Sequence, residues 1–150
     1  MVFYDVLCCS YRSMATVGDG GGCTEVIDVL VVDDEPQLAE MIGIYLERTD
    51  ETLDVATATS ASEGLATLDE SVDCVISDYH MPQMDGLAFL DRVSERVPDA
   101  VRILYTSDDD IDLMIAARDA GIDYVHKEVS TAQYAAMATH IRRRATVTRR

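Results

Sequence analysis

The chain has 150 residues, of which 48% are hydrophobic, so it can form one domain with a substantial core but not two ordinary domains. Its formal net charge of −16 argues against the binding of nucleic acid or of an anionic membrane by this domain. No apolar run approaches the roughly 18 residues of a membrane helix, and the start lacks a secretion signal. We therefore expect a cytoplasmic protein with no membrane segment.

The charged residues are of unusual types and are unevenly placed. Of the 28 acidic residues 19 are aspartates, and of the 12 basic residues all but Lys127 are arginines. Five arginines lie among the last nine residues, so we assign residues 145–150 to a basic tail. Abundant aspartate with almost no lysine resembles proteins of salt-loving archaea, in which salt screens the repulsion between carboxylates. This resemblance implies a halophilic, haloarchaeal source.

The beginning of the chain differs in composition from the rest. Residues 1–25 show no sustained hydrophobic period, and the glycine-rich run at 18–22 is typical of a flexible linker. We therefore expect a flexible arm at residues 1–25 and a folded domain at residues 26–144. Three of the four cysteines fall in the arm, and none forms a Cys-x-x-Cys pair, so neither a zinc site nor a disulfide framework is indicated. The fourth, Cys74, is expected in the core.

An apolar run at residues 27–32 leads directly into Asp33, Asp34, Glu35 and Pro36. Such a continuous aliphatic run is typical of a strand covered on both faces of a parallel sheet. Proline has no N–H to lose in a first helical turn, so a helix should follow at once. Two adjacent carboxylates repel by roughly 4 kcal/mol at about 4 Å in an effective dielectric of about 20, so this pair favours a cation. Replacement of either aspartate by asparagine should raise thermal stability in metal-free buffer.

The rest of the chain alternates between helical and strand patterns. Apolar residues three and four positions apart predict helices, and short apolar runs predict strands. In chain order we expect a helix at 36–49, a strand at 53–58, a helix at 60–68, a strand at 72–77, a helix from Leu87, a strand at 101–105, a helix from Asp108 or Asp109 to Gly121, a strand at 123–126 and a helix at 130–144.

Two of the predicted helices carry more detailed signals. In the helix that ends near residue 121, we expect Ile111, Met114 and Ile115 to face the core. The last helix begins with Ser130 followed three residues later by Gln133, which is the pattern of a capping box.

Five strands that alternate with five helices imply right-handed crossovers and a central parallel sheet, so we predict a doubly wound α/β domain. Functional groups in such sheets collect beyond the carboxyl ends of the strands. The strand ends carry Asp33 and Asp34, then Asp78, Thr106 and Lys127, so these side chains should lie together. Carboxylates are suited to Mg²⁺, and a hydroxyl and an ammonium can hold phosphate oxygens. The predicted site is therefore one for a divalent metal and a phosphoryl group.

Four segments at these strand ends resemble the receiver domain of two-component response regulators, and they are residues 31–35, 77–86, 104–106 and 124–127. Their order and spacing agree with that family over roughly residues 26–144. The resemblance implies a flavodoxin-like sheet of strand order 2-1-3-4-5 with five helices. It also implies a phosphorylation-dependent signalling switch with weak self-dephosphorylation, rather than a metabolic enzyme.

The resemblance also assigns roles to the residues of the expected metal site. Asp78 would accept a phosphoryl group from a phosphohistidine of a sensor histidine kinase. Asp34, Asp78 and the backbone carbonyl of His80 would bind Mg²⁺, with Asp33 acting partly through water. The side chain of His80 is expected to have no role of its own.

On the remaining strands, Thr106 and Lys127 would bind the phosphoryl group, and Tyr124 would be the aromatic switch residue. A downstream partner would dock on the surface formed by the last two helices and the strand between them. One departure from the family pattern is Glu128, because the family commonly has proline after the lysine. A cis bond before a non-proline residue costs about 2.5–4 kcal/mol, so we predict a trans peptide between Lys127 and Glu128.

Two other functions remain as alternatives. A phosphatase similar to the haloacid dehalogenases also uses aspartate and Mg²⁺ on an α/β sheet, but that class has an Asp-x-Asp motif. Here Asp33-Asp34-Glu35-Pro36 lacks the second aspartate at the required position. The other alternative is a receiver that binds partners without phosphorylation, and the full set of expected site residues argues against it.

Overall fold

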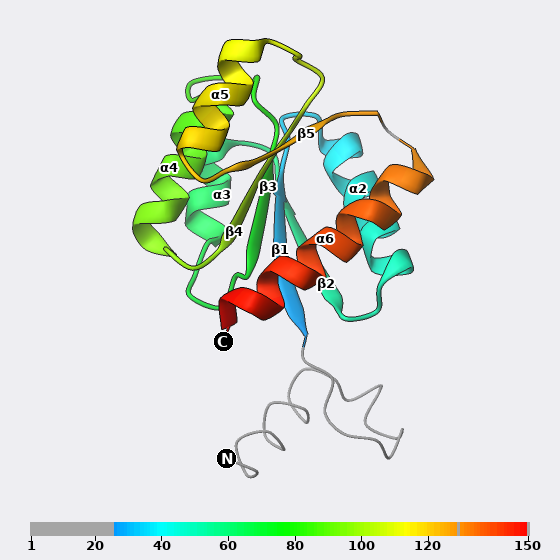
Figure 1. Ribbon diagram of the computed structural model, residues 1–150. Helices are drawn as coiled ribbons and strands as arrows, with labels where there is room; N and C mark the ends of the chain where they lie inside the picture. Colours follow the sequence, from blue (N-terminus) through cyan, green and yellow to red (C-terminus); the bar gives the residue numbers. More distant parts are fainter. Residues whose placement is uncertain (1–25, 129, 150) are drawn as a thin grey trace, which may run out of the picture.

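The computed structural model describes residues 26–128 and 130–149, in which strands and helices alternate along the chain (Figure 1). The elements are β1 (Ile27–Val32), α2 (Pro36–Thr49), β2 (Leu53–Ala58), α3 (Ala61–Thr67), β3 (Cys74–Ser77), α4 (Gly86–Arg96), β4 (Val101–Thr106), α5 (Ile111–Asp119), β5 (Asp123–His126) and α6 (Thr131–Arg149). The predicted alternation is confirmed, and β3 begins two residues later than expected.

The five strands form one parallel sheet in the order β2-β1-β3-β4-β5, so the predicted fold class is confirmed. Backbone hydrogen bonds continue past the ends of the strands. The amide of Asp78 donates to the carbonyl of Val32 at 3.0 Å, and that of Lys127 donates to Thr106 at 2.8 Å. The carboxyl ends of β1, β3, β4 and β5 are therefore held level at one edge of the sheet, which we call the carboxyl edge.

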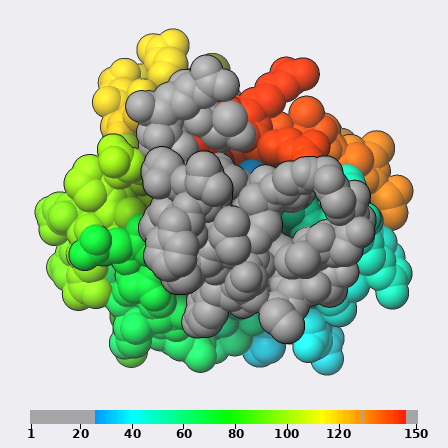
Figure 2. Space-filling model, turned by 90° about the horizontal axis from the view of Figure 1, so that it is seen from below, coloured from blue at the N-terminus to red at the C-terminus, as the bar shows by residue number. Residues whose placement is uncertain are grey.

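Helices cover both faces of this sheet. Helices α2 and α6 lie on one face and α3, α4 and α5 on the other, as Figure 1 shows. Seen from below in Figure 2, α3 and α4 (green) lie on one side of the molecule, with α2 (cyan) and α6 (orange to red) on the other. Alternate residues of β1 enter the two cores, with Val29 and Val31 under α2 and α6 and with Leu30 and Val32 under the other helices. This burial on both faces accounts for the continuous apolar run.

The predicted core-facing side of α5 is wrong. Ile111 is 67% exposed and Ile115 is 44% exposed, whereas Leu113 and Ala117 are buried in the core beneath the helix. The i, i+3, i+4 spacing of Ile111, Met114 and Ile115 led the sequence pattern to favour that side of the helix. Packing of the helix against the sheet instead selects the pair at 113 and 117.

The predicted start of α5 is also wrong. Its N-cap is Asp110, whose carboxylate accepts a hydrogen bond from the amide of Asp112 at 2.9 Å. Asp108 lies two residues before Asp110, and its carboxylate accepts a hydrogen bond from the amide of Asp110 at 3.0 Å. In a run of three aspartates each can serve as a cap, and the loop geometry decides which one does.

The last helix extends beyond the predicted end of the domain at residue 144, because α6 runs from Thr131 to Arg149. Residues 145–149 are therefore helical and not a separate tail. Ala145 is 1% exposed and belongs to the core under α2 and α6, so packing supports the additional turn. The predicted apolar face of this helix is confirmed, because its members are all buried, namely Tyr134, Met137, Ala138 and Ile141.

The predicted flexible arm at residues 1–25 lies outside the described residues, together with Cys8, Cys9 and Cys23. Cys74 is buried in the core, as predicted, and burial raises the pKa of its thiol. Within residues 26–128 and 130–149, no helix has both the length and the apolar character that a membrane span requires.

Candidate functional site at the carboxyl edge

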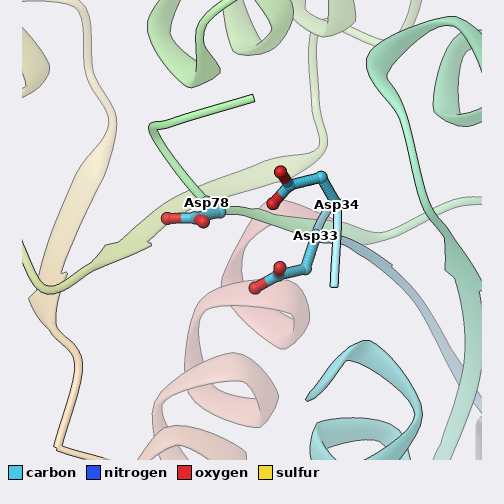
Figure 3. A group of neighbouring side chains, drawn as sticks. All are labelled: Asp33, Asp34 and Asp78. Atoms are coloured by element: carbon cyan, nitrogen blue, oxygen red, sulfur yellow. The ribbon is translucent and has the colours of Figure 1, made fainter. Parts of the chain in front are cut away.

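Three aspartates from neighbouring strand ends face one another at the carboxyl edge (Figure 3). Asp33 and Asp34 follow β1, Asp78 follows β3, and one oxygen from each lies within 4.8 Å of the others. Asp33 is buried, Asp34 is exposed and Asp78 is partly buried. The predicted convergence of the three carboxylates is therefore confirmed, and the group is open to solvent on the side of Asp34.

Lys127, which follows β5, also reaches this group from the same edge of the sheet. Its Nζ lies 3.3 Å from Oδ2 of Asp33 and 3.7 Å from Oδ1 of Asp78. The side chains are only 11%, 3% and 15% exposed for Lys127, Asp33 and Asp78. One largely buried ammonium thus contacts two carboxylates, while Asp34 adds a third negative charge beside them. The site retains a net negative charge that a bound cation would offset.

The environment of Asp78 disfavours its charged form. Burial raises the pKa of its carboxyl, the Lys127 ammonium lowers it in part, and Asp33 and Asp34 raise it again. The amide of Tyr79 donates to Oδ1 of Asp78 at 2.8 Å, which favours the carboxylate. The net result is a raised pKa for a carboxyl at the centre of the site, a feature typical of functional carboxylates.

The loop from β3 to α4 brings backbone close to Asp78. A Cβ at Gly86 would lie 2.2 Å from the carbonyl oxygen of Asp78 and 2.9 Å from Cα of Tyr79, so only glycine fits there. The amide of Gly86 also donates to the carbonyl of Tyr79 at 2.8 Å. Gln83, in the same loop, has a φ of 73°, and its two neighbours are joined by a hydrogen bond across it. The sequence did not predict this close contact.

Thr106 and Tyr124 are connected by a residue that sequence analysis did not assign to the site. Asp108 donates its amide to Oγ1 of buried Thr106 at 3.2 Å, and its carbonyl accepts the hydroxyl of Tyr124. Its carboxylate lies 3.1 Å from Nε2 of His80. Asp108 therefore contacts three of the predicted site residues. In a chain so rich in aspartate its identity carries no signal, and only the folded loop shows its role.

Two further predictions concern the loops beside the site. The side chain of His80 contacts Asp108, although we expected it to have no role of its own, and the metal-binding role of its carbonyl stays a prediction. No cis peptide bond occurs among the described residues, so the bond between Lys127 and Glu128 is trans, as predicted.

Comparison with known proteins agrees with this geometry. The sequence model of the response regulator receiver domain matches residues 29–139. The chain is 38% identical over 95 residues to the transcriptional regulatory protein GlrR of Escherichia coli, covering 63% of this chain and 21% of that protein. It is 35% identical over 124 residues to the probable transcriptional regulatory protein TcrX of Mycobacterium tuberculosis, covering 81% of this chain and 52% of that protein. It thus spans about a fifth of the first relative and half of the second.

Among solved structures, a response regulator receiver domain protein from Clostridium thermocellum superposes with a TM-score of 0.72 at 29% identity, covering 81% of this chain and 98% of that one. Receiver domains are signalling phosphoacceptors of two-component systems, not metabolic enzymes. The match extends from β1 into α6 and includes every strand end described above. This chain therefore belongs to the response regulator receiver domain family.

Proposed function

We propose that Asp78 is the phosphoacceptor of this receiver and that its donor is a phosphohistidine of a sensor histidine kinase. The observation that carries this proposal is the group of three carboxylates within 4.8 Å, with the ammonium of Lys127 against two of them. In the transfer, an oxygen of the Asp78 carboxylate forms a bond to phosphorus while the bond between phosphorus and the histidine nitrogen breaks. The product is an acyl phosphate, which water slowly hydrolyses back to the carboxylate.

The donor set at the carboxyl edge fits Mg²⁺. Mg²⁺ prefers hard oxygen ligands and is usually held by one or two carboxylates together with water and phosphate oxygens. We assign Asp34, Asp78 and the carbonyl of His80 as its ligands, and Asp33 as a ligand partly through water. The bound ion would neutralise charge on the phosphoryl oxygens. The ammonium of Lys127 contacts the carboxylates of Asp33 and Asp78.

The phosphoryl oxygens would be bound by Lys127 and by the hydroxyl of Thr106. Oγ1 of Thr106 accepts from the amide of Asp108, and Asp108 also accepts the hydroxyl of Tyr124. Movement of Thr106 toward a phosphoryl oxygen would therefore disturb Asp108 and release Tyr124. This route provides a physical basis for Tyr124 as the switch residue.

The downstream partner would dock on the surface formed by α5, β5 and α6. Ile111 and Ile115 are exposed on α5, which lies next to the Tyr124 hydroxyl contact, so this surface offers apolar groups whose position depends on the switch. We do not assign nucleic acid or an anionic membrane as a partner of this domain, because the charge of −16 would repel both.

We also propose that residues 1–25 form an arm outside the receiver domain and that the protein comes from a halophilic archaeon. The second proposal is supported by the composition, with 28 acidic residues and one lysine. Unfolding in potassium chloride tests it, since a halophilic protein should gain stability from about 0.1 M to 3 M salt. An unchanged or falling stability over this range would contradict a halophilic source.

Phosphorylation is tested with acetyl phosphate and Mg²⁺, followed by intact mass. We expect the gain of one phosphoryl group by the wild-type protein and none by Asp78→Asn. The matched control is Asp99→Asn, which removes an exposed aspartate far from the carboxyl edge and should leave the gain unchanged. Full phosphorylation of Asp78→Asn would show that another residue is the acceptor.

The switch is tested by amide chemical shifts with and without beryllofluoride and Mg²⁺. We expect changes in α5, β5 and the start of α6, and little change in β2. Asp78→Asn should abolish the response, whereas Thr106→Ala should confine it to the loops around Asp34 and Asp78. Wild-type changes restricted to those two loops would contradict the switch mechanism even if Asp78 is phosphorylated.

A further inference from the structure

The side-chain amide of Gln133 contacts the backbone on both sides of Lys127. Its Nε2 donates to the carbonyl of His126 at 2.6 Å, and its Oε1 accepts the amide of Glu128 at 2.9 Å. A carboxamide is planar and rigid, so these two contacts fix the backbone on either side of Lys127 relative to α6. The second contact requires an N–H at residue 128, which a proline would lack.

Tyr105 connects the same amide to the head of the lysine. Its hydroxyl donates to Oε1 of Gln133 at 2.5 Å, and its ring centroid lies 5.4 Å from Nζ of Lys127. Tyr105 lies on β4 and is 1% exposed, so its ring is held firmly by the core. A cation is attracted to the face of an aromatic ring at this distance. The amide and the ring thus constrain the lysine at its backbone and at its ammonium.

Helix capping alone does not explain these contacts. Ser130 precedes α6, and its hydroxyl accepts the backbone amide of Gln133 at 3.1 Å, which is the expected cap of the first turn. That bond uses the main chain of Gln133. The side chain extends out of the helix to three groups outside α6, on His126, Glu128 and Tyr105.

We propose that Gln133 is a positioning residue that sets the place of Lys127 relative to Asp33 and Asp78. This inference rests on the proposed phosphoryl transfer to Asp78. Lysine has a long flexible stem, so the position of its ammonium depends on how its backbone is held. Displacement of a group in an active site by about 1 Å can slow a reaction by about 100-fold. Loss of the contacts of Gln133 should therefore lower the rate of phosphorylation.

The first test compares Gln133→Met and Gln133→Glu with the wild type, by the rate of phosphoryl gain from acetyl phosphate with Mg²⁺. Methionine keeps the length of the side chain but loses all three contacts, and we expect a rate about 10-fold lower. Glutamate keeps an acceptor for Glu128 and Tyr105 but cannot donate to His126. The rate of Gln133→Glu should therefore lie between those of the wild type and Gln133→Met. Tyr105→Phe keeps the ring beside Lys127 and should reduce the rate by about 3-fold.

The second test uses the single lysine of the chain, which gives one ε-methylene signal in protein labelled with carbon-13 lysine. In Gln133→Met this signal should move toward the position of a solvent-exposed lysine, while the amide signals of β1 and β3 stay unchanged. Ser130→Ala is the matched control, because it weakens the start of α6 without removing the amide contacts. It should lower the melting temperature but leave the lysine signal and the rate unchanged.

The outcomes separate the two proposals. If the wild-type protein gains no phosphoryl group, the proposed function fails. If the wild type is phosphorylated and Gln133→Met matches it in both rate and lysine signal, the positioning role is overturned. Equal effects of Ser130→Ala and Gln133→Met would also overturn it, because they would indicate only a structural role. If Gln133→Met does not fold, the rates and lysine signals of Gln133→Glu and Tyr105→Phe test the positioning role instead. Values equal to those of the wild type would overturn it.

Discussion

The two ends of the sheet use the same kinds of charged residue in different ways. At the carboxyl edge, Asp33 and Asp78 share the ammonium of Lys127, and Asp34 adds a third carboxylate within 4.8 Å. These paired groups are largely buried, and the negative charges outnumber the positive one.

At the opposite end of the strands, which we call the amino edge, Asp123 and Asp50 have basic partners of their own. Asp123 at the start of β5 contacts His140 at 2.9 Å and Arg144 at 2.8 Å, both on α6. Arg142 lies 3.4 Å from Asp50, which precedes β2. Arg142 and Arg144 therefore hold α6 against α2 and the sheet.

The difference between the edges separates a structural role from a functional one. Ion pairs with a largely exposed arginine, such as those of α6, contribute less stability than buried pairs and are screened by salt. A buried excess of like charge destabilises a fold unless a ligand offsets it, so such a cluster indicates a binding site. Removal of one charge at a time should therefore affect the two edges differently.

The largest expected effect is loss of the cation at the carboxyl edge. In metal-free buffer at pH 7, Lys127→Met should lower the free energy of unfolding by about 3 kcal/mol, because it leaves the buried carboxylate of Asp33 and the partly buried one of Asp78 without a cationic partner. Arg144→Met, at a residue that is 45% exposed, should cost about 1 kcal/mol or less. Urea unfolding measures both, and equal losses would contradict the distinction between the edges.

The next effect concerns Mg²⁺. The wild-type protein should gain about 2.7 kcal/mol of stability when free Mg²⁺ is about 100 times its Kd, because only the folded state holds the carboxylates together. Asp34→Asn should lose most of this gain, whereas Asp119→Asn, an exposed residue of α5, should retain it. Thermal unfolding with Mg²⁺ or EDTA measures the difference. An undiminished Mg²⁺ effect in Asp34→Asn would remove this residue from the metal site.

A smaller effect distinguishes the two adjacent aspartates in EDTA. From the sequence we expected both asparagine variants to be stabilised, since each removes a like charge. In the structure Asp33 is the partner of Lys127 and accepts the amide of Glu35 at 2.9 Å, so Asp33→Asn should lose about 1–3 kcal/mol. Asp34 is exposed beside the others, and Asp34→Asn should gain about 0.5 kcal/mol. Melting temperatures that change in the same direction would contradict this separation.

The smallest expected effect is a pH dependence from Asp78. Burial is the main cause that raises its folded-state pKa above the usual 3.8, so the folded state binds this proton more tightly than the unfolded state. The contribution of Asp78 is therefore favourable at acidic pH and is lost as pH rises from 3.8 through the folded pKa. Asp78→Asn should be more stable than the wild type at pH 7 in EDTA, and the difference should shrink toward pH 4. A difference that grows toward pH 4 would contradict the sign.

The sequence alone determined the fold class and most of the site. Parallel strands end at a common edge, so residues placed directly after buried strands, such as Asp33, Asp78 and Lys127, are brought to the same edge of the sheet. Periodicity and strand ends are local properties, and they can be recognised without knowing which helix lies beside which strand.

The pairing of these residues depends on how the separate elements pack against one another. Asp33 and Lys127 are 94 residues apart, and their contact distinguishes Asp33 from its neighbour Asp34 in a way that local sequence does not. Asp108 and Gln133 were expected at most to cap helices, but each contacts groups on other elements. Such contacts depend on distances between side chains of separate elements. Those distances are set by packing of the whole domain and not by any local pattern.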